Sequence, residues 1–522
     1  MKAFLMYRDR DFEFRGRFSP TGWYGHGRPF PEVDAALPPH AGDLIQDLAL
    51  DTLFSAMARG DPFLYAIAKQ AVIHSLTDPG AIQYRQDILQ DCLAHPDVVR
   101  EMYHLAAEAI IRESKVFRST YSATSILSSA VDSMQVLVEM LKRLRAIAVR
   151  HGDRFRSMGF RRFFDMLKGE LDDGYFATIA EHLHRLKFGS GELISAQLGK
   201  GNKGINYVLR KPYPDTRSWL DRILGKGPPA YSYEVPPRDE AGAQALGQLA
   251  SRGANSVANA LAQSADHVVN FFHMLLAELG FYVGCLNLYE QLAVKGEPTC
   301  IPTPLDMNAS RFSAEGLYDV CLALRTQGRV VGNTVAADHK ELVIITGANQ
   351  GGKSTFLRSI GLAQLMMQCG MFVPAVRLAA NVCNGVFTHF KREEDVSMQG
   401  GKFDEELSRM SNLLDSLQPR ALMLFNESFA STNEREGAEI ARQIVRALLV
   451  ARVKIFYVTH MYDLADGFRR QNREDTLFLR AERWPDGRRT FRLIEGEPLA
   501  TSYGLDLYRE VFRDERTGGG LD

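Results

Sequence analysis

The chain has 522 residues, which is long enough for about three domains. Hydrophobic residues make up 45% of it and charged residues 24%, as in an ordinary globular protein. The formal net charge of −1 excludes an attraction to nucleic acid through overall charge, so any such attraction has to be local.

The first 125 residues divide into an irregular arm and a helical part. Residues 1–38 are rich in Gly, Pro and aromatic residues and have no helical period, so we expect an irregular amino-terminal arm. From 39 to 125 we expect the first part of a helical core. Apolar residues three and four apart predict one helix over LIQDLALDTLFSAMA (44–58), and Asp-Pro pairs at Asp61 and Asp78 predict the starts of two more.

Residues 126–240 predict a helical lever or clamp-like arm that carries a β-hairpin. The helical run SILSSAVDSMQVLVEMLKRLRAIAVRHG opens it, and two short alternating segments flank GKGNKG (199–204). A Pro- and Gly-rich loop marks its end. Residues 141–226 hold 18 basic against 9 acidic side chains, which indicates either a phosphate-facing surface or a solvated arm that happens to be basic.

Residues 241–309 are expected to complete the helical core. They contain VVNFFHMLLAELGFYVGCLNLY (268–289), which is long enough to span a membrane. Polar residues interrupt this run, among them His273 and Glu278, and such residues are costly in lipid. We therefore expect a helix buried inside the protein and no membrane partner.

Residues 310–522 alternate between strand and helix patterns. ELVIITG, ALMLFNE and VKIFYVTH are three short apolar runs, and a helical pattern follows each one. Such alternation predicts a parallel sheet with helices on both faces. The expected fold class is thus multidomain, with an all-α core and lever region that has a helical arm, followed by an α/β P-loop NTPase (ABC-like) domain.

GANQGGKST (347–355) fits the phosphate-loop pattern G-x-x-x-x-G-K-[ST] and directly follows the strand ELVIITG. Its glycines let backbone N–H groups face a phosphate, Lys353 brings a positive charge, and the Ser354 hydroxyl is a magnesium ligand. The helix that follows adds its positive end. We expect ATP and Mg²⁺ here, bound by Gly347, Ala348, Asn349, Gln350, Gly351, Gly352, Lys353, Ser354 and Thr355.

ALMLFNE (421–427) ends where an ATPase usually carries two acids, the first steadying magnesium and the second activating water. The first position is Asn426, which offers a carbonyl oxygen to magnesium but no charge, whereas Glu427 is retained as the general base. His460, at the end of VKIFYVTH, is placed to sense the γ-phosphate. Glu427, His460 and Lys353 are therefore the catalytic candidates of a slow ATPase.

The six cysteines are scattered, without a CxxC pair or a nearby histidine cluster. We expect reduced and mostly buried thiols, as in a cytoplasmic protein that could associate with the nucleoid. The amino terminus turns charged after six residues and has no signal-peptide core.

These motifs together resemble the MutS family of DNA mismatch-repair ATPases. The block TGANQGGKSTFLRSIGLAQLMMQCGMFVPA (346–375), the loop NESFASTNEREG (426–437), the strand YVTHMYDL and the segment TSYGLDLYREVF (501–512) carry the resemblance. It is strong over 340–512, moderate over 40–125 and 240–300, and poor elsewhere.

The resemblance implies a homodimer in which each subunit completes its partner's ATP site, with long helices joining these sites to a clamp around DNA. Gly400, Gly401 and Lys402 align with the signature that reaches the partner's γ-phosphate. Phosphate contacts with DNA are expected on the hairpin, from Lys200, Lys203, Arg210 and Lys211.

Three departures from the family pattern stand out. There is no room for a mismatch-reading domain, because the helical core begins near residue 40, and a lone F-x-E at Phe30 is coincidental. Gly401-Lys402-Phe403 stands where the family keeps Ser-Thr-Phe, and Asn426 replaces an acid. The chain also stops soon after the Ser-Tyr-Gly segment, so we expect no C-terminal helical dimerisation element.

Two other functions share the nucleotide chemistry. A nucleotide-gated protein-interaction switch without DNA binding is consistent with the near-neutral charge and with Asn426. A transporter subunit or chromosome-condensing ATPase lacks support, because no Leu-Ser-Gly-Gly-Gln signature is present.

Overall fold

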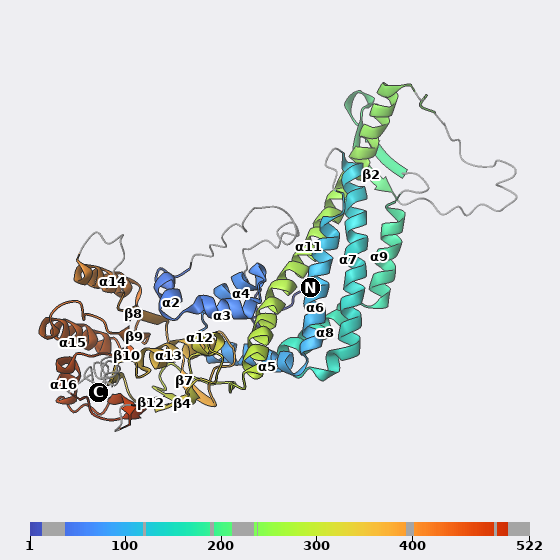
Figure 1. The fold of residues 1–522 in the computed structure, drawn as a ribbon. Helices are drawn as coiled ribbons and strands as arrows, with labels where there is room; N and C mark the ends of the chain where they lie inside the picture. Colours follow the sequence, from blue (N-terminus) through green and yellow to red (C-terminus); the bar gives the residue numbers. More distant parts are fainter. Residues whose placement is uncertain are drawn as a thin grey trace, which may run out of the picture.

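The computed structural model describes residues 1–12, 37–117, 122–187, 193–210, 234–236, 238–392, 401–484 and 488–499. Figure 1 shows a body that combines helices with β-sheet and a long helical arm that rises from it. The predicted combination of helical and α/β parts in one multidomain chain is confirmed.

Eight helices precede the hairpin among the described residues: α2 (Ala41–Asp47), α3 (Leu50–Ala58), α4 (Pro62–Ile73), α5 (Pro79–Ala94), α6 (Pro96–Ser114), α7 (Ala123–His151), α8 (Met158–Glu170) and α9 (Asp173–Arg185). The starts predicted at the Asp-Pro pairs are confirmed. Asp61 caps α4 by accepting hydrogen bonds from Phe63 and Leu64, and Asp78 caps α5 in the same way. In both helices the proline occupies the first turn, where its missing N–H costs nothing.

The single helix expected over residues 44–58 is wrong, because the segment forms α2 and α3 with a break between them. Ala49 lies at the break in the left-handed conformation, with φ of 54°. Leu48 and Leu50, on either side, are both fully buried. The break thus turns two nearby leucines inward, which a continuous helix could not do since residues two apart face different directions.

One 55-residue helix, α11 (Glu240–Val294), forms the spine of the arm. At 1.5 Å per residue it is about 80 Å long. It packs along α6 and α7, and the predicted hairpin, formed by antiparallel β1 (Leu193–Leu198) and β2 (Gly204–Arg210), lies at its far end (Figure 1). This helix is long and apolar enough to cross a membrane, but 78% of its most apolar window is buried inside the protein.

The described part of the amino-terminal arm, residues 1–12, is irregular as predicted, yet it is built into the core. Leu5, Met6 and Phe12 are buried, and their backbone N–H groups all donate to the carboxylate of Glu278 on α11. Burial raises the pKa of Glu278 to about 7, against the lowering effect of these hydrogen bonds. Phe30 lies outside the described residues.

The main sheet has six strands in the order β12-β11-β6-β10-β9-β8. All neighbours are parallel except β12, so the predicted parallel sheet is confirmed with one antiparallel edge strand. Its strands are β6 (Leu342–Thr346), β8 (Val386–Phe390), β9 (Leu422–Asn426), β10 (Lys454–Val458), β11 (Thr476–Arg483) and β12 (Arg489–Glu495). A second sheet, not predicted, has the order β3-β7-β4-β5: β3 (Thr303–Leu305), β4 (Phe312–Leu317), β5 (Asn333–Ala336) and β7 (Arg377–Asn381).

Alternate residues of the central strands enter two separate cores, which explains why these strands are apolar throughout. On β6, Val343 and Ile345 face the core that holds α13 (Lys353–Gln368), whereas Leu342 and Ile344 face the other one. The second core holds α14 (Lys402–Ser416), α15 (Glu434–Val450) and α16 (Tyr462–Arg469). A short helix, α12 (Val320–Arg325), packs beside α3.

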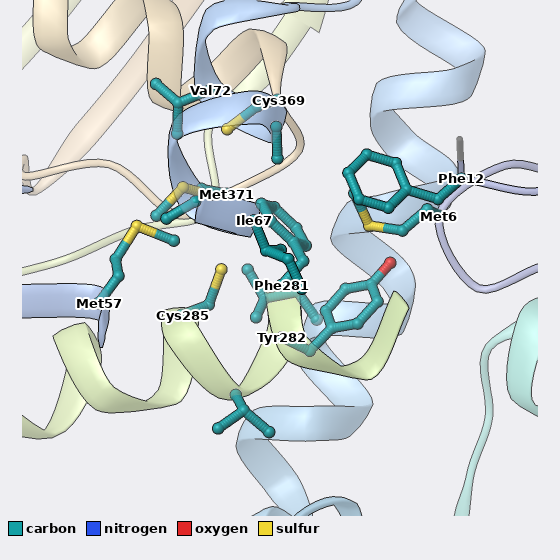
Figure 2. Close-up of a cluster of buried hydrophobic side chains, with 14 of the residues drawn as sticks. Met6, Phe12, Met57, Ile67, Val72, Phe281, Tyr282, Cys285, Cys369 and Met371 are labelled. Atoms are coloured by element: carbon teal, nitrogen blue, oxygen red, sulfur yellow. The ribbon is translucent and has the colours of Figure 1, made fainter. Parts of the chain in front are cut away.

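Helix α13 joins the two halves of the molecule. It starts at the phosphate-loop sequence and ends at Gln368, whose side chain and carbonyl both bond to the backbone of Leu76. The next residue, Cys369, lies in one apolar cluster with α3, α4 and α11 and with the amino-terminal segment (Figure 2). The helical and α/β halves therefore share a core.

Candidate active site

The phosphate-loop sequence lies between β6 and α13, at the carboxyl edge of the main sheet. Gly347 and Gly352 have φ of 112° and 88°, which favour glycine. A Cβ on Gly347 would stand 2.8 Å from the backbone nitrogen of Ala481 on β11. The loop is thus held close against the neighbouring strand, and only glycine fits there.

Lys353 is the first residue of α13 and is buried. Its ammonium donates hydrogen bonds to the carbonyls of Gly347 at 3.0 Å and Ala348 at 2.9 Å. Burial lowers the pKa of Lys353 to about 8, and the charge of Glu427 acts in the opposite direction. Lys353 is therefore mainly protonated at neutral pH, with its charge directed into the loop.

Ser354 and Asn426 meet as the sequence predicted. The Ser354 hydroxyl donates to the side-chain oxygen of Asn426 over 2.9 Å, although 72 residues separate them. Magnesium prefers oxygen ligands and keeps several waters, so two neutral oxygens beside the carboxylate of Glu427 fit it. The site offers less negative charge than an acidic pair would.

Glu427 and His460 form the second pair of the site. His460 Nε2 lies 2.8 Å from Glu427 Oε1, and this hydrogen bond is the main reason why the pKa of Glu427 is lowered. Glu427 has a φ of 54°, an uncommon conformation for a non-glycine residue, and its N–H donates to the carbonyl of Val458. Strained backbone of this kind is concentrated at functional sites.

The residues after Glu427 are fixed by a buried network that the sequence did not reveal. His389 bonds to the Ser428 hydroxyl at 2.8 Å and to the carbonyl of Glu406 at 3.1 Å. Burial lowers the pKa of His389 to about 4, so this histidine is neutral. The Glu406 carboxylate accepts from the N–H of Phe429, which connects α14 to the loop that carries Glu427.

The predicted partner-contacting signature lies at the start of α14. Gly401 is the N-cap of the helix and Lys402 its first residue. Gly400 lies outside the described residues, as does the Ser-Tyr-Gly segment at 501–512. Within the described part, the signature is thus one turn from Glu406 and the network behind Glu427.

A cavity of about 270 Å³ adjoins the phosphate loop, and sequence reasoning missed it. Phe491 of β12, Val331 and Asn333 line it together with Gly352 and Thr355 of the loop. Phe491 and Val331 are 49% and 40% exposed, so apolar surface faces this opening. Beside it, Arg489 donates to Gln350 over 2.8 Å. No local sequence pattern identifies these residues, because they come next to the loop only in the folded structure.

The basic side chains of the arm differ in their partners. Along the shaft several are in ion pairs with acids, for example Arg143 with Glu108 and Arg145 with Asp173. On the hairpin, Lys200 and Lys203 are exposed and have no ion-pair partner among the described residues. Arg210 is also exposed and donates to Ser195, while Lys211 lies outside the described residues. The tip thus presents unpaired positive charge, as do some shaft residues such as Arg161, which also has no ion pair among the described residues.

Two family models match the chain: MutS2 N-terminal domain over residues 77–295 and MutS domain V over 343–513. A protein named DNA mismatch repair protein MutS from Porphyromonas gingivalis is 32% identical over 176 residues, which are 33% of this chain and 20% of that protein. The same-named protein of Desulfosudis oleivorans is 30% identical over 201 residues, 37% and 23% of the two chains. MutS protein homolog 4 of Mus musculus is 28% identical over 150 residues, 29% of this chain and 16% of the other.

The fold and the site define a multidomain protein in which an α/β part with a phosphate-loop sequence is continuous with a helical arm. The chain belongs to the MutS family. The first match covers the arm, so the poor resemblance stated for 126–240 is wrong. The chain spans about a fifth of the length of the curated MutS relatives it matches.

Proposed function

We propose that this chain is a P-loop ATPase of the ABC-like kind that binds ATP with Mg²⁺, hydrolyses it slowly and binds DNA as a homodimer. The observation that carries the proposal is the pairing of Glu427 with His460 at 2.8 Å, on the same sheet edge as Lys353 and the Ser354–Asn426 pair. The general base, the positive charge of Lys353 and the oxygen atoms suited to magnesium thus all lie beside the phosphate loop. We place the protein in the cytoplasm, with the nucleoid as its DNA source.

In this proposal each residue has one task. Lys353 exchanges its two loop carbonyls for phosphate oxygens, and its charge stabilises those that develop in the reaction. Glu427 accepts a proton from the attacking water, while His460 holds the carboxylate in position. Magnesium, held by Ser354 and Asn426, would supply charge stabilisation at the phosphates. The cavity beside Phe491 accommodates the adenine ring of ATP.

Asn426 is the reason for expecting slow turnover. A neutral amide holds magnesium less tightly than a carboxylate, because no full charge opposes the cation. The base is retained, so hydrolysis continues at a lower rate. Gly401 and Lys402 are proposed to reach the partner's γ-phosphate, which makes the active site dependent on dimerisation.

The coupling to DNA is supported by two features. Helix α13 connects the loop to the core that holds α11, and α11 is proposed to act as a lever that extends to the hairpin. Lys200, Lys203 and Arg210 at the tip are exposed cations suited to phosphate contact. Family membership favours this function over a protein-interaction switch without DNA.

The decisive test measures ATP hydrolysis in parallel with duplex, mismatched, branched and single-stranded DNA. DNA affinity is measured in the same samples by fluorescence anisotropy over a range of salt concentrations. We expect ATP-dependent affinity with a steep salt slope, because several phosphates are neutralised. A flat salt response, or equal affinity with and without ATP, would contradict the DNA part of the proposal.

A matched pair of charge reversals locates the contact. Lys203→Glu at the tip should reduce the salt slope by about one and weaken binding to all sequences alike. Arg161→Glu, at an exposed position of α8 at the base of the arm, makes the same charge change and should leave both nearly unaltered. Equal effects of the two reversals would mean that the tip has no special role.

A further inference from the structure

A cavity of about 290 Å³ opens at the amino edge of the main sheet, the edge opposite the phosphate loop. Leu422 and Lys454, where β9 and β10 begin, are among its lining residues. Because the central strands are parallel and five residues long, the two edges are about 16 Å apart. The cavity is therefore separate from the candidate active site.

The charge of this lining is strongly positive. Lys340, Arg420, Arg452 and Lys454 line the cavity, and Glu341 is the single carboxylate among the lining residues, all of which are described. Neutral donors complete the wall: Asn308, Ser310 and Asn381. Two further carboxylates lie near the cavity. The charge of Asp338 acts on Lys454, and the charge of Arg420 acts on Asp306. The four basic residues and the one carboxylate that line the cavity leave an excess of three positive charges.

Lys454 is a partly buried cation of this wall. Its ammonium donates to the carbonyl of Ala337 over 2.9 Å and lies 5.7 Å from the centre of the Phe312 ring. Burial lowers the pKa of Lys454 to about 8, so it is mainly charged at neutral pH. An ammonium with one carbonyl bond retains donors for an anion.

The backbone at the two arginines points to function. Arg452 has a φ of 57° and lies two residues beyond the end of α15, and its N–H and that of Val453 bond back to Leu449 and Leu448. This is the helix-end position that glycine normally fills. Arg420 has a φ of 62° as the third residue of the turn Gln418–Ala421, which also normally takes glycine. The two turns are joined by a hydrogen bond from the Arg420 N–H to the Ala451 carbonyl.

Neither arginine has a carboxylate partner among the residues that the structure describes. Both arginines hold a strained backbone conformation, and no ion pair compensates for its cost. A ligand bound by their guanidinium groups would explain why arginine stands at both positions. We infer that this cavity is a second anion site of the protein, and that it takes a small phosphorylated anion of the pyrophosphate class. Arginine suits this ligand because its fork matches two phosphate oxygens.

Inorganic pyrophosphate is the probe, and binding stoichiometry is measured by calorimetry on the full chain. We expect two sites in the parent protein, one in Lys353→Ala, one in Arg420→Gly/Arg452→Gly and none in the combined variant. Glycine relieves the strained backbone, so the double variant should melt no lower than the parent. Asn472→Gly, a positive-φ residue that does not line the cavity, controls for the backbone change and should keep both sites.

The outcomes separate cleanly. Affinity at the second site should fall at least about tenfold in the arginine variant, and orthophosphate should compete for it. No binding to Lys353→Ala, or unchanged binding to the arginine variant, would overturn the inference. A parent with one site, lost only in the arginine variant, would uphold it while contradicting the proposed active site. If the arginine variant loses affinity for duplex DNA and keeps pyrophosphate, the edge contacts a DNA backbone and the small-anion assignment is wrong.

Discussion

The two edges of the main sheet solve the same backbone problem in opposite ways. At the carboxyl edge two of the three left-handed residues of the phosphate loop are glycines, Gly347 and Gly352, because the backbone itself approaches another strand there; the third is Gln350. At the amino edge two of the left-handed residues are Arg420 and Arg452, whose side chains line a cavity. The comparison is thus between left-handed glycines that let the backbone approach a neighbouring strand and left-handed arginines whose side chains line a cavity.

The largest effect should come from removing the base at the carboxyl edge. Glu427→Ala is expected to reduce ATP turnover by about 100- to 10,000-fold, since it removes the carboxylate proposed to accept the proton. Steady-state hydrolysis and nucleotide affinity should be measured together, with Glu427→Gln as the isosteric control. Affinity should survive in both variants, and turnover equal to the parent's would refute this assignment.

Restoring the missing charge should act in the opposite direction. Asn426→Asp is expected to raise turnover roughly tenfold and to lower the magnesium concentration needed for half-maximal rate, because charge-assisted interactions exceed neutral ones by about 1.4 kcal/mol. Magnesium titrations of the ATPase rate check this. A decrease in rate at all magnesium concentrations would show that the amide is required.

The pairing of His460 with Glu427 predicts a pH effect. The hydrogen bond lowers the pKa of Glu427, so the carboxylate is ready as a base well into the acidic range. His460→Ala removes the main lowering influence and leaves burial, which raises the pKa. The acidic limb of the rate profile should therefore move to higher pH, and an unmoved limb would mean that His460 does not act through Glu427.

The contact between α15 and the loop that follows Glu427 should tolerate no added side-chain volume. A Cβ on Gly437 would stand 2.2 Å from the carbonyl oxygen of Phe429, so one of these backbones has to move. Gly437→Ala is expected to destabilise the protein by about 1–3 kcal/mol, measured by denaturant unfolding. Gly169→Ala, which meets nothing within 4 Å, is the matched control and should not destabilise it.

The smallest effect belongs to the amino edge. Arg452→Gly relieves a left-handed conformation that costs about 1–2 kcal/mol, and glycine returns part of this gain as extra freedom of the unfolded chain. A net stabilisation of about 0.5 kcal/mol is expected in urea unfolding. A loss of stability would mean that Arg452 is held by interactions of its own, and the contrast between the edges would then fail.

The sequence could predict most of the carboxyl edge because its chemistry is contiguous. Asn426 ends one strand, Glu427 follows it, and His460 lies just beyond another, so parallel pairing alone brings them together. The break at Ala49 and the second sheet were missed, because apolar spacing does not show where a helix stops or which short strands pair. The His389 network and the amino-edge cavity join residues from several strands and turns, and no local pattern reports such encounters.

Helix α13 connects the two halves of the protein as one continuous, rigid element. A helix is stiff along its axis, so a small displacement of its Lys353 end should arrive almost undiminished at Gln368, where paired hydrogen bonds hold Leu76. If nucleotide binding displaces α13, the Gln368–Leu76 contact is where the helical half should respond, and hydrogen exchange of the Leu76 amide with and without nucleotide would measure it.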